Sequence, residues 1–236
     1  MGVTEILRAA AAPYGLTVDD GLAAKLEIYA RELAAWNEKL NLTAIRDEQG
    51  VAVKHFLDCL LVTQCAGFSS GTLIDVGTGA GFPGLVLAAA FPGLSVTLLD
   101  STGKKLAAVE SIAKEMGVSN VAFLHARAEE AGRLPAYRER FDFVTARAVA
   151  ALPVLLEYAL PFARTGGAFF AMKGAAAGEE LSAAANALAV LHGEVVKEYD
   201  FTLPGGDERT VFCIKKISQI SPKYPRPFAQ LTKKPL

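Results

Sequence analysis

The sequence is poor in cysteine, histidine and long apolar runs, and each shortage excludes a class of protein. Its 236 residues include three cysteines and three histidines, without the paired spacing of zinc ligands, so we expect no metal site. The three thiols are expected to be small buried residues in a reducing cytosol. Charges interrupt every apolar run before the ~20 residues of a membrane span, and the first residues lack a signal-peptide layout. We therefore expect a cytoplasmic protein that does not enter a membrane.

The chain also lacks an excess of either charge, because its net charge is −1. This balance argues against a protein that coats nucleic acid. The charges are unevenly distributed, however: residues 215–236 hold six basic side chains and no acid, whereas residues 1–66 hold nine acids and six bases. Such asymmetry is typical either of an anionic partner held at one end or of a solvated tail that keeps the protein soluble.

The hydrophobic pattern divides the chain into three parts: a helical segment at 1–66, an α/β domain at 67–218 and a basic tail at 219–236. The first part carries an apolar stripe with helical spacing, formed by Leu22, Leu26, Tyr29, Leu33, Trp36 and Leu40. Polar residues lie on or beside the helical stripes, and we interpret them as caps or buried hydrogen-bonding groups: Asn37, Asn41, His55 and Asp58. His125 and His192 suggest no chemistry either.

The α/β domain is predicted from strands that alternate with helical patterns. Five apolar stretches are expected to be strands: 73–76, 95–99, 121–124, 141–146 and 168–172. Helices are expected at 148–162, with Pro153 at its start or at a kink, and at 178–191. Two further strands, 194–203 and 209–217, flank a turn. Alternation of this kind predicts a mostly parallel, doubly wound sheet that ends in an antiparallel hairpin.

Residues 72–84 carry the strongest functional signal, because an apolar strand there leads into four closely spaced glycines and then a helix. The glycines fit the dinucleotide pattern G-x-G-x-x-G, with Asp100 about 20 residues further on as its ribose-binding acid. They also fit the pattern D-x-G-x-G-x-G of S-adenosylmethionine enzymes. Asp75, at the end of the strand, could meet an ammonium group there. We favour S-adenosylmethionine, and a nicotinamide-dependent oxidoreductase remains the alternative.

Ligands of such sheets bind at the carboxyl ends of the strands, which restricts the candidate residues. These ends carry Asp75, Asp100, the segment 127–129, Arg147 and Lys173. Three acids suit a cofactor with an amine, a ribose diol and an adenine amino group. Arg127 and Arg147 could either contact a ligand or form salt bridges across the strand ends.

Several segments, in order along the chain, resemble the RsmG family, also called GidB, of bacterial 16S ribosomal RNA guanine-N7 methyltransferases. They are Asn41-Leu42-Thr43, His55-Phe56-Leu57-Asp58, the glycine segment extended by Phe82-Pro83-Gly84, Ala128-Glu129, Ala146-Arg147-Ala148 and Met172-Lys173-Gly174. The resemblance runs from about residue 36 to the carboxyl terminus. Lys223-Tyr224-Pro225-Arg226 and Lys234-Pro235-Leu236 match the end of the family, but Ala229 and Leu231 stand where it has glycine and proline.

The resemblance implies a class I S-adenosylmethionine-dependent methyltransferase fold, Rossmann-like and preceded by a helical segment. It also implies methylation of N7 of one guanine, at position 527 in the 530 loop of 16S ribosomal RNA, as naked RNA or in the small ribosomal subunit. Together with the glycine pattern, it indicates these cofactor-binding residues: Asp75, Gly77, Gly79, Gly81, Phe82, Asp100, Ser101, Thr102, Ala128, Glu129 and Arg147.

Guanine N7 has a free lone pair and no proton, so its methylation needs no general base, and no nucleophile–base pair is evident in the sequence. Arg147 is accordingly expected to position the cofactor or the base. Candidate RNA contacts are Lys173, Lys223, Tyr224, Arg226, Lys233 and Lys234. Removal of 219–236 should weaken RNA binding and leave cofactor affinity intact, and an equal loss of both would mean that the tail is structural. Alternatives are methylation of another RNA or a small molecule, or non-catalytic binding of RNA or cofactor.

Overall fold

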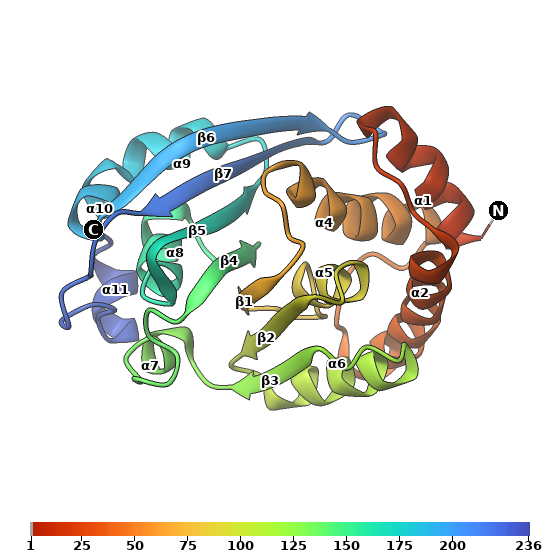
Figure 1. Cartoon of the computed structure of the whole chain (residues 1–236), viewed down its shortest axis with the longest axis horizontal. Coiled ribbons are helices and arrows are strands. Elements are labelled where there is room, and N and C mark those ends of the chain that lie inside the picture. The colour runs from red at the N-terminus through yellow and green to blue at the C-terminus, as the bar shows by residue number, and fades with distance from the viewer. Residues whose placement is uncertain (1) are drawn as a thin grey trace.

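The computed structural model describes residues 2–236 and shows an α/β fold around one seven-stranded sheet (Figure 1). The strands are β1 (Gly71–Val76), β2 (Leu94–Asp100), β3 (Val121–His125), β4 (Phe141–Arg147), β5 (Ala163–Lys173), β6 (Gly193–Thr202) and β7 (Glu208–Lys216). They lie in the order β3-β2-β1-β4-β5-β7-β6, and all are parallel except β7, which runs antiparallel between β5 and β6. This confirms the predicted parallel sheet with a terminal hairpin. The strand order reverses between β1 and β4, where such sheets bind ligands.

Helices cover both faces of the sheet (Figure 1). One face carries α1 (Val3–Ala11), α2 (Asp20–Leu40), α3 (Glu48–Gly50), a π-helical stretch (Val51–Leu57), α4 (Asp58–Leu61), α5 (Gly84–Ala90) and α6 (Gly103–Glu115). The other carries α7 (Ala128–Ala131), α8 (Leu152–Ala159), α9 (Ala177–Ala183), α10 (Ala185–Val190) and α11 (Phe228–Lys233). Short 3-10 turns occupy 12–14 and 62–64. Within residues 2–236, no helix combines the length and apolar character needed to cross a membrane.

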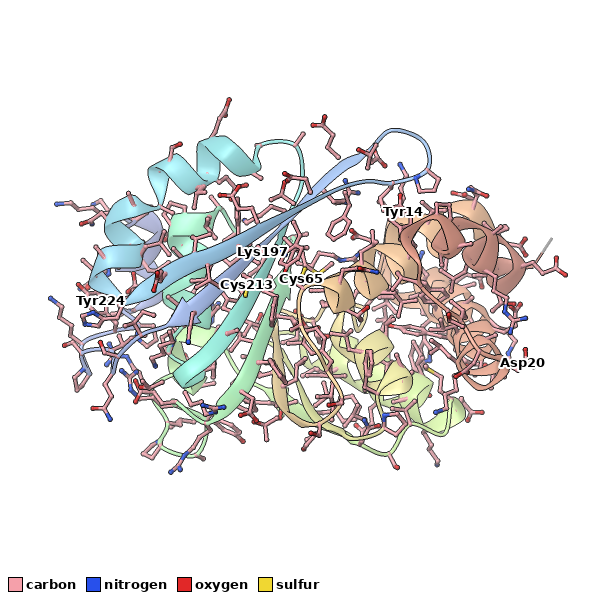
Figure 2. All side chains as sticks on the ribbon, turned by 45° about the horizontal axis from the view of Figure 1, so that its top comes forward. Tyr14, Asp20, Cys65, Lys197, Cys213 and Tyr224 are labelled. Carbon is pink, nitrogen blue, oxygen red and sulfur yellow. The ribbon has the colours of Figure 1, made fainter. Side chains whose placement is uncertain are left out.

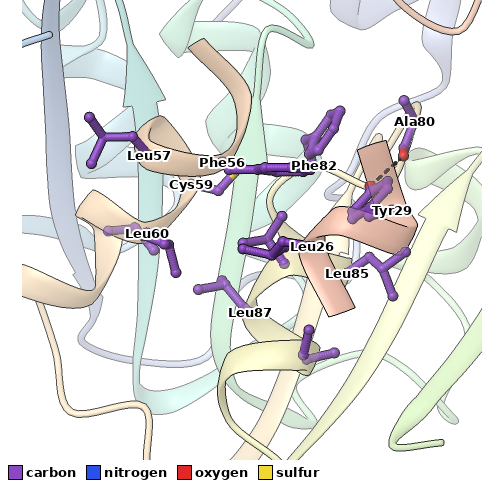
Figure 3. Packing of buried hydrophobic residues seen from close by; sticks show 14 of the residues in the cluster. Leu26, Tyr29, Phe56, Leu57, Cys59, Leu60, Ala80, Phe82, Leu85 and Leu87 are labelled. Carbon is purple, nitrogen blue, oxygen red and sulfur yellow. Dashed lines mark hydrogen bonds between the residues drawn. The ribbon is translucent and has the colours of Figure 1, made fainter. Parts of the chain in front are cut away.

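The N-terminal helices share one hydrophobic core with the α/β domain, so the predicted boundary near residue 66 does not separate two packing units. In α2, Leu26 and Tyr29 are fully buried and pack against Phe56, Phe82 and other apolar side chains of the same core (Figure 3). The Tyr29 hydroxyl also donates a 2.6 Å hydrogen bond to a backbone carbonyl of the glycine segment. The helical segment is thereby attached directly to the predicted ligand-binding loop.

Two predicted helices are shorter than expected. Arg147 is the last residue of β4, and the backbone then turns through Ala148 at φ 56° before α8 begins at Leu152. Pro153 lies in the first turn of α8, where a backbone N–H would have no hydrogen-bond acceptor within the helix, so proline is tolerated there. The predicted helix at 178–191 is divided into α9 and α10 by a bend at the fully buried Ala184. The buried side chains on both sides of this bend are alanines, Ala177 in α9 and Ala187 in α10, and they face the core.

The C-terminal segment packs on the face covered by α8, where Tyr224 and Leu231 are buried. Tyr224 lies at the opposite end of the molecule from Asp20 of α2 (Figure 2). Arg133 and Arg138, which follow α7, donate hydrogen bonds to backbone carbonyls of the segment at residues 220–225. Residues 219–236 are therefore packed against the domain, in contrast to the solvated tail that was one interpretation of the basic composition.

The three cysteines are free thiols. Cys59 and Cys65 are buried and Cys213 is half-buried on β7, and the last two lie in the middle of the molecule (Figure 2). Burial raises the pKa of the Cys65 thiol to about 12 and also raises the pKa of Cys59. Protonated thiols of this kind are poor nucleophiles, which agrees with their interpretation as small core residues.

Candidate active site

The loop between β1 and α5 is braced from below by Asp75, the fifth residue of β1. Its Oδ2 accepts hydrogen bonds from the Thr78 hydroxyl (2.7 Å) and the Gly84 amide (2.9 Å), and its Oδ1 accepts one from the Thr145 hydroxyl (3.0 Å). Asp75 has no exposed surface. Burial raises its pKa to about 6, although these hydrogen bonds act in the opposite direction. The sequence placed Asp75 against a ligand ammonium, whereas the structure places its carboxylate beneath the loop.

The glycines of this loop allow a backbone path that side chains would block. Gly77 has φ 73°, and a Cβ there would lie 2.6 Å from Cγ2 of Val149. Gly81 has φ 100°, and a Cβ there would lie 2.4 Å from the Tyr29 hydroxyl. Both positions therefore require glycine for conformation and for space. At Gly79 the nearest atom to such a Cβ is 3.9 Å away, an ordinary van der Waals contact, so the positive φ of 59° rather than space favours glycine there.

Phe82 connects the loop to the N-terminal helices. Its ring stacks on Tyr29 at 5.2 Å between centroids and on His55 at 4.4 Å, and the Arg147 guanidinium lies 5.0 Å from its centre. It is 5% exposed, and that edge lines a cleft of about 440 Å³ beside Gly77–Gly79. The ring of Phe82 thus contacts the helical segment through Tyr29 and His55 and contacts β4 through Arg147.

Asp100 ends β2 at the opposite wall of this cleft. Its Oδ2 accepts a hydrogen bond from the Gly79 amide (2.9 Å) and its Oδ1 accepts one from the Thr102 amide (2.8 Å). Ser101 and Thr102 line the same cleft and are exposed. Because a carboxylate oxygen can accept more than one hydrogen bond, Asp100 retains acceptor capacity toward the cleft.

Glu129, in α7, lines a smaller adjoining pocket of about 190 Å³ together with Asp100, Ala128 and Tyr158. The residue is 7% exposed, yet its Oε1 has no hydrogen-bond partner in the part of the chain that the structure describes. The nearest cation, Arg127, lies at 3.7 Å, beyond hydrogen-bond distance. A buried acceptor without a donor is costly in a folded protein, so this oxygen is suited to a ligand donor.

Arg147 is fixed by three partners from the N-terminal segment. Its Nη1 donates to Asp58 Oδ2 (2.7 Å) and to the Lys54 carbonyl (3.0 Å), and its Nη2 lies 3.1 Å from His55 Nδ1. Because a guanidinium can only donate, His55 Nδ1 is the acceptor, and its Nε2 then donates to the Thr43 hydroxyl (2.8 Å). Both His55 nitrogens are therefore occupied by structural hydrogen bonds, as the sequence analysis expected.

Burial, followed by the Arg147 charge, lowers the pKa of His55 to about 4. An unfolded histidine has a pKa near 6.5, so between about pH 4 and 6.5 the unfolded chain binds more protons at this residue. Its contribution to stability therefore rises with pH across this window and is lost as pH falls through 4. We expect wild-type protein to gain up to about 3 kcal/mol from His55 over this range.

Urea titrations between pH 4.5 and 6.5 test this expectation for the His55→Gln variant, whose free energy of unfolding should lack that rise. His125→Gln, which changes an exposed histidine, is the matched control and should retain the wild-type pH dependence. A His55→Gln profile parallel to that of wild type would show that His55 is not held neutral in the folded protein.

A second, open pocket of about 760 Å³ adjoins the cleft and shares His55, Arg147 and residues 148–149 with it. Four cations and three acids line it: Lys54, Arg147, Lys173, Arg209, Asp58, Asp207 and Glu180. The sequence offered no signal for Lys54, Arg209 or Asp207, because their juxtaposition depends on the β6–β7 hairpin folding over the π-helical stretch. Asp58 was interpreted only as a hydrogen-bonding residue, and it bridges Arg147 (2.7 Å) and Arg209 (3.3 Å).

Three of the predicted RNA contacts have protein partners instead. Lys173 is 8% exposed and pairs with Glu180 (2.7 Å) and the Ala150 carbonyl (2.6 Å). Tyr224 is buried, and Arg226 pairs with the fully buried Glu157 (2.7 Å). Lys173, Tyr224 and Arg226 are therefore buried or engaged within the protein, and their contact with RNA stays a prediction. The remaining candidates are exposed on the surface: Lys223, Lys233 and Lys234.

The fold is shared with solved structures of low sequence identity. YcgJ of Bacillus subtilis superposes with a TM-score of 0.55 and 15% identity, covering 70% of this chain and 100% of that chain. TrmN of Thermus thermophilus superposes with a TM-score of 0.54 and 21% identity, covering 69% of this chain and 49% of that one. At these identities the comparison establishes the class I methyltransferase fold alone.

Sequence relatives are far closer. The proteins named ribosomal RNA small subunit methyltransferase G from Alkaliphilus metalliredigens and Exiguobacterium sibiricum are 45% and 46% identical over 233 and 229 residues. These alignments cover 98% and 96% of this chain, and the same shares of the two relatives. A family model described as "GidB: rRNA small subunit methyltransferase G" matches residues 22–207. This chain therefore belongs to the GidB family of rRNA small subunit methyltransferase G.

Proposed function

We propose that this protein transfers a methyl group from S-adenosylmethionine to N7 of one guanine of 16S ribosomal RNA, at position 527 in the 530 loop. The observation that carries the proposal is the union of two sites: the cleft beside the glycine loop opens into the cation-lined pocket at His55 and Arg147. Family membership supports ribosomal RNA as the substrate, and the atom and position follow from the family resemblance. Either the naked RNA or the small subunit could present the guanine.

The residues of the cleft fit S-adenosylmethionine. The unpartnered Glu129 Oε1 and the spare acceptor capacity of Asp100 require donors, which an adenine amino group and a ribose diol supply. Asp100 would hold the ribose, Glu129 the base, and the part of the cleft lined by Gly77–Gly79 would admit the methionine portion. Asp75 supports this surface from beneath. When bound, S-adenosylmethionine supplies an electrophilic methyl group on a sulfonium sulfur.

His55 and Arg147 line both the cleft and the second pocket, and there the protein acts by positioning the guanine and the cofactor. Guanine N7 carries no proton to remove, and His55 cannot accept one at Nδ1 because Arg147 donates to it there. Three of the five Arg147 N–H donors are occupied, and the remaining two can bind a guanine edge or the cofactor. Alignment of reacting atoms alone can lower a barrier by ~7–11 kcal/mol in favourable cases.

The substrate must expose N7 to this pocket. An A-form helix hides N7 in a deep and narrow groove, so the guanine must come from a loop or be splayed out. The four cations of the pocket are paired with its three acids, which leaves one net positive charge to attract a phosphate backbone at its rim. This charge balance supports an RNA substrate over a neutral small molecule.

Transfer of tritiated methyl groups to unmodified 16S RNA and to small subunits tests the proposal. We expect a single labelled nucleoside, 7-methylguanosine, and a decrease of roughly 100-fold in kcat/KM for Arg147→Ala. Arg31→Ala, which changes an exposed arginine of α2, is the control and should retain wild-type activity. Labelling of a different atom or RNA would contradict the assigned substrate, and full activity of Arg147→Ala would exclude its positioning role.

A further inference from the structure

The pocket beside Glu129 has an apolar wall that the family motifs do not account for. Five large apolar side chains are exposed among residues 2–236: Leu134, Val149, Val196, Ile217 and Phe228. Two of them, Val149 and Phe228, line this one pocket, although they come from segments about 80 residues apart. Exposed apolar side chains that converge on a pocket are typical of a surface that a ligand covers.

Phe228, the first residue of α11, is held in place by charged groups. The Arg127 guanidinium lies 5.0 Å from its ring centre, and the same arginine lies 3.7 Å from Glu129. The residue before α11 follows Arg226, whose backbone amide and guanidinium both bind Glu157 in α8 (2.6 and 2.7 Å). Glu157 is fully buried, so α11 is anchored to the core of the domain.

We propose that Phe228 forms the outer aromatic wall of the adenine pocket, so that the C-terminal segment is part of the cofactor site. The inference rests on the proposed function, because it assumes that adenosine occupies this pocket. Glu129 provides a hydrogen-bond acceptor at the edge of such a base, with Asp100 beside it for the ribose, and a purine ring would cover the exposed faces of Phe228 and Val149. Aromatic stacking on one base contributes about 1–3 kcal/mol to binding by alanine substitution.

Equilibrium binding of S-adenosylmethionine, and of adenosine alone, to the full-length protein tests this assignment. Phe228→Ala should raise both dissociation constants about 5- to 150-fold, because the lost contact is to the base. Phe228→Tyr should restore the affinity, since it retains the ring. Ile217→Ala, which removes an equally exposed side chain from another surface, should have no effect; both residues are 48% exposed.

The outcomes separate this inference from the proposed function. Unchanged affinity of Phe228→Ala for both ligands would overturn the inference while leaving the methyltransferase assignment intact. Weaker RNA binding at unchanged S-adenosylmethionine affinity would overturn it as well, and would assign Phe228 to the substrate surface. Failure of the wild-type protein to bind S-adenosylmethionine would overturn both. An equal decrease in the melting temperature of ligand-free Phe228→Ala and Phe228→Tyr, without aromatic rescue of binding, would indicate a structural role only.

Discussion

Replacement of Asp75 by alanine is expected to unfold the glycine loop and abolish S-adenosylmethionine binding. The change leaves three buried donors without an acceptor, at Thr78, Gly84 and Thr145. At about 2 kcal/mol for each donor, the free energy of unfolding should fall by about 6 kcal/mol at low pH. Equilibrium denaturation in urea measures the loss of stability, and calorimetric titration with S-adenosylmethionine measures the loss of binding.

The size of this effect should depend on pH. Burial raises the pKa of Asp75 to about 6 in the folded protein, so folding takes up a proton there between about pH 4 and 6. The contribution of Asp75 to stability is therefore largest below pH 4 and decreases as pH rises through 6. The deficit of Asp75→Ala should shrink to about 3 kcal/mol at pH 7.5. Asp20→Ala, which removes an almost fully exposed carboxylate, is the control and should remain stable and bind the cofactor.

A wild-type melting curve together with wild-type cofactor affinity in Asp75→Ala would contradict the bracing role. Loss of affinity at unchanged stability would instead place the carboxylate in contact with the ligand, as the sequence alone suggested. The two measurements therefore distinguish a residue that supports the loop from one that contacts the ligand.

Replacement of Arg226 by alanine is expected to destabilise the protein by about 3–5 kcal/mol, because it leaves the carboxylate of Glu157 buried without its cation. Burial of Arg226 itself is incomplete, since 20% of its side chain is exposed, which places the effect toward the lower end of that range. Chemical denaturation measures the change. Cofactor affinity should fall with stability, because α11 carries Phe228 and lines the adenine pocket.

Lys233→Ala is the control, since it removes an exposed cation from α11, the helix that follows Arg226. It should leave stability and cofactor binding unchanged. If it lowers RNA affinity, the slope of the logarithm of the binding constant against the logarithm of salt concentration should fall by about one. If Arg226→Ala weakened RNA binding alone, the C-terminal segment would be the RNA-binding tail that its composition suggested. Removal of 219–236 should likewise reduce both stability and cofactor affinity.

The strands and the ligand-binding edge could be predicted because they depend on local patterns. Short apolar runs separated by helical periodicity identify the parallel sheet, and acids or glycines directly after a strand must lie at its carboxyl end. Asp100 illustrates this: as the last residue of β2 it lies at the carboxyl end of the sheet, where its carboxylate accepts a hydrogen bond from the Gly79 amide. The lengths of helices next to turns were less predictable, as in α8, because the backbone at Ala148 adopts a positive φ without a glycine to signal it.

The roles of charged side chains were decided by their partners, which lie far away in the sequence. Arg226 and Lys173 appeared in the sequence as free cations, but tertiary packing places Glu157 and Glu180 against them. Asp75 appeared as a ligand contact, but the threonine of a neighbouring strand and the loop amide occupy its oxygens. The sequence shows which residues are charged, but it does not show which atoms form their hydrogen bonds and ion pairs.

The family, the strands of the sheet, the glycine loop and the acid at the end of β2 could be read from the linear sequence, because each shows as a short local pattern or as a series of such patterns in order along the chain. Only the tertiary structure decided that the helical segment and the C-terminal segment belong to the same body as the site. It also decided that Arg147 is oriented by Asp58 and that Phe228 borders the pocket of Glu129. Hydrogen bonds and desolvation act over a few ångströms in space, so these assignments depend on which distant residues the fold brings within that range.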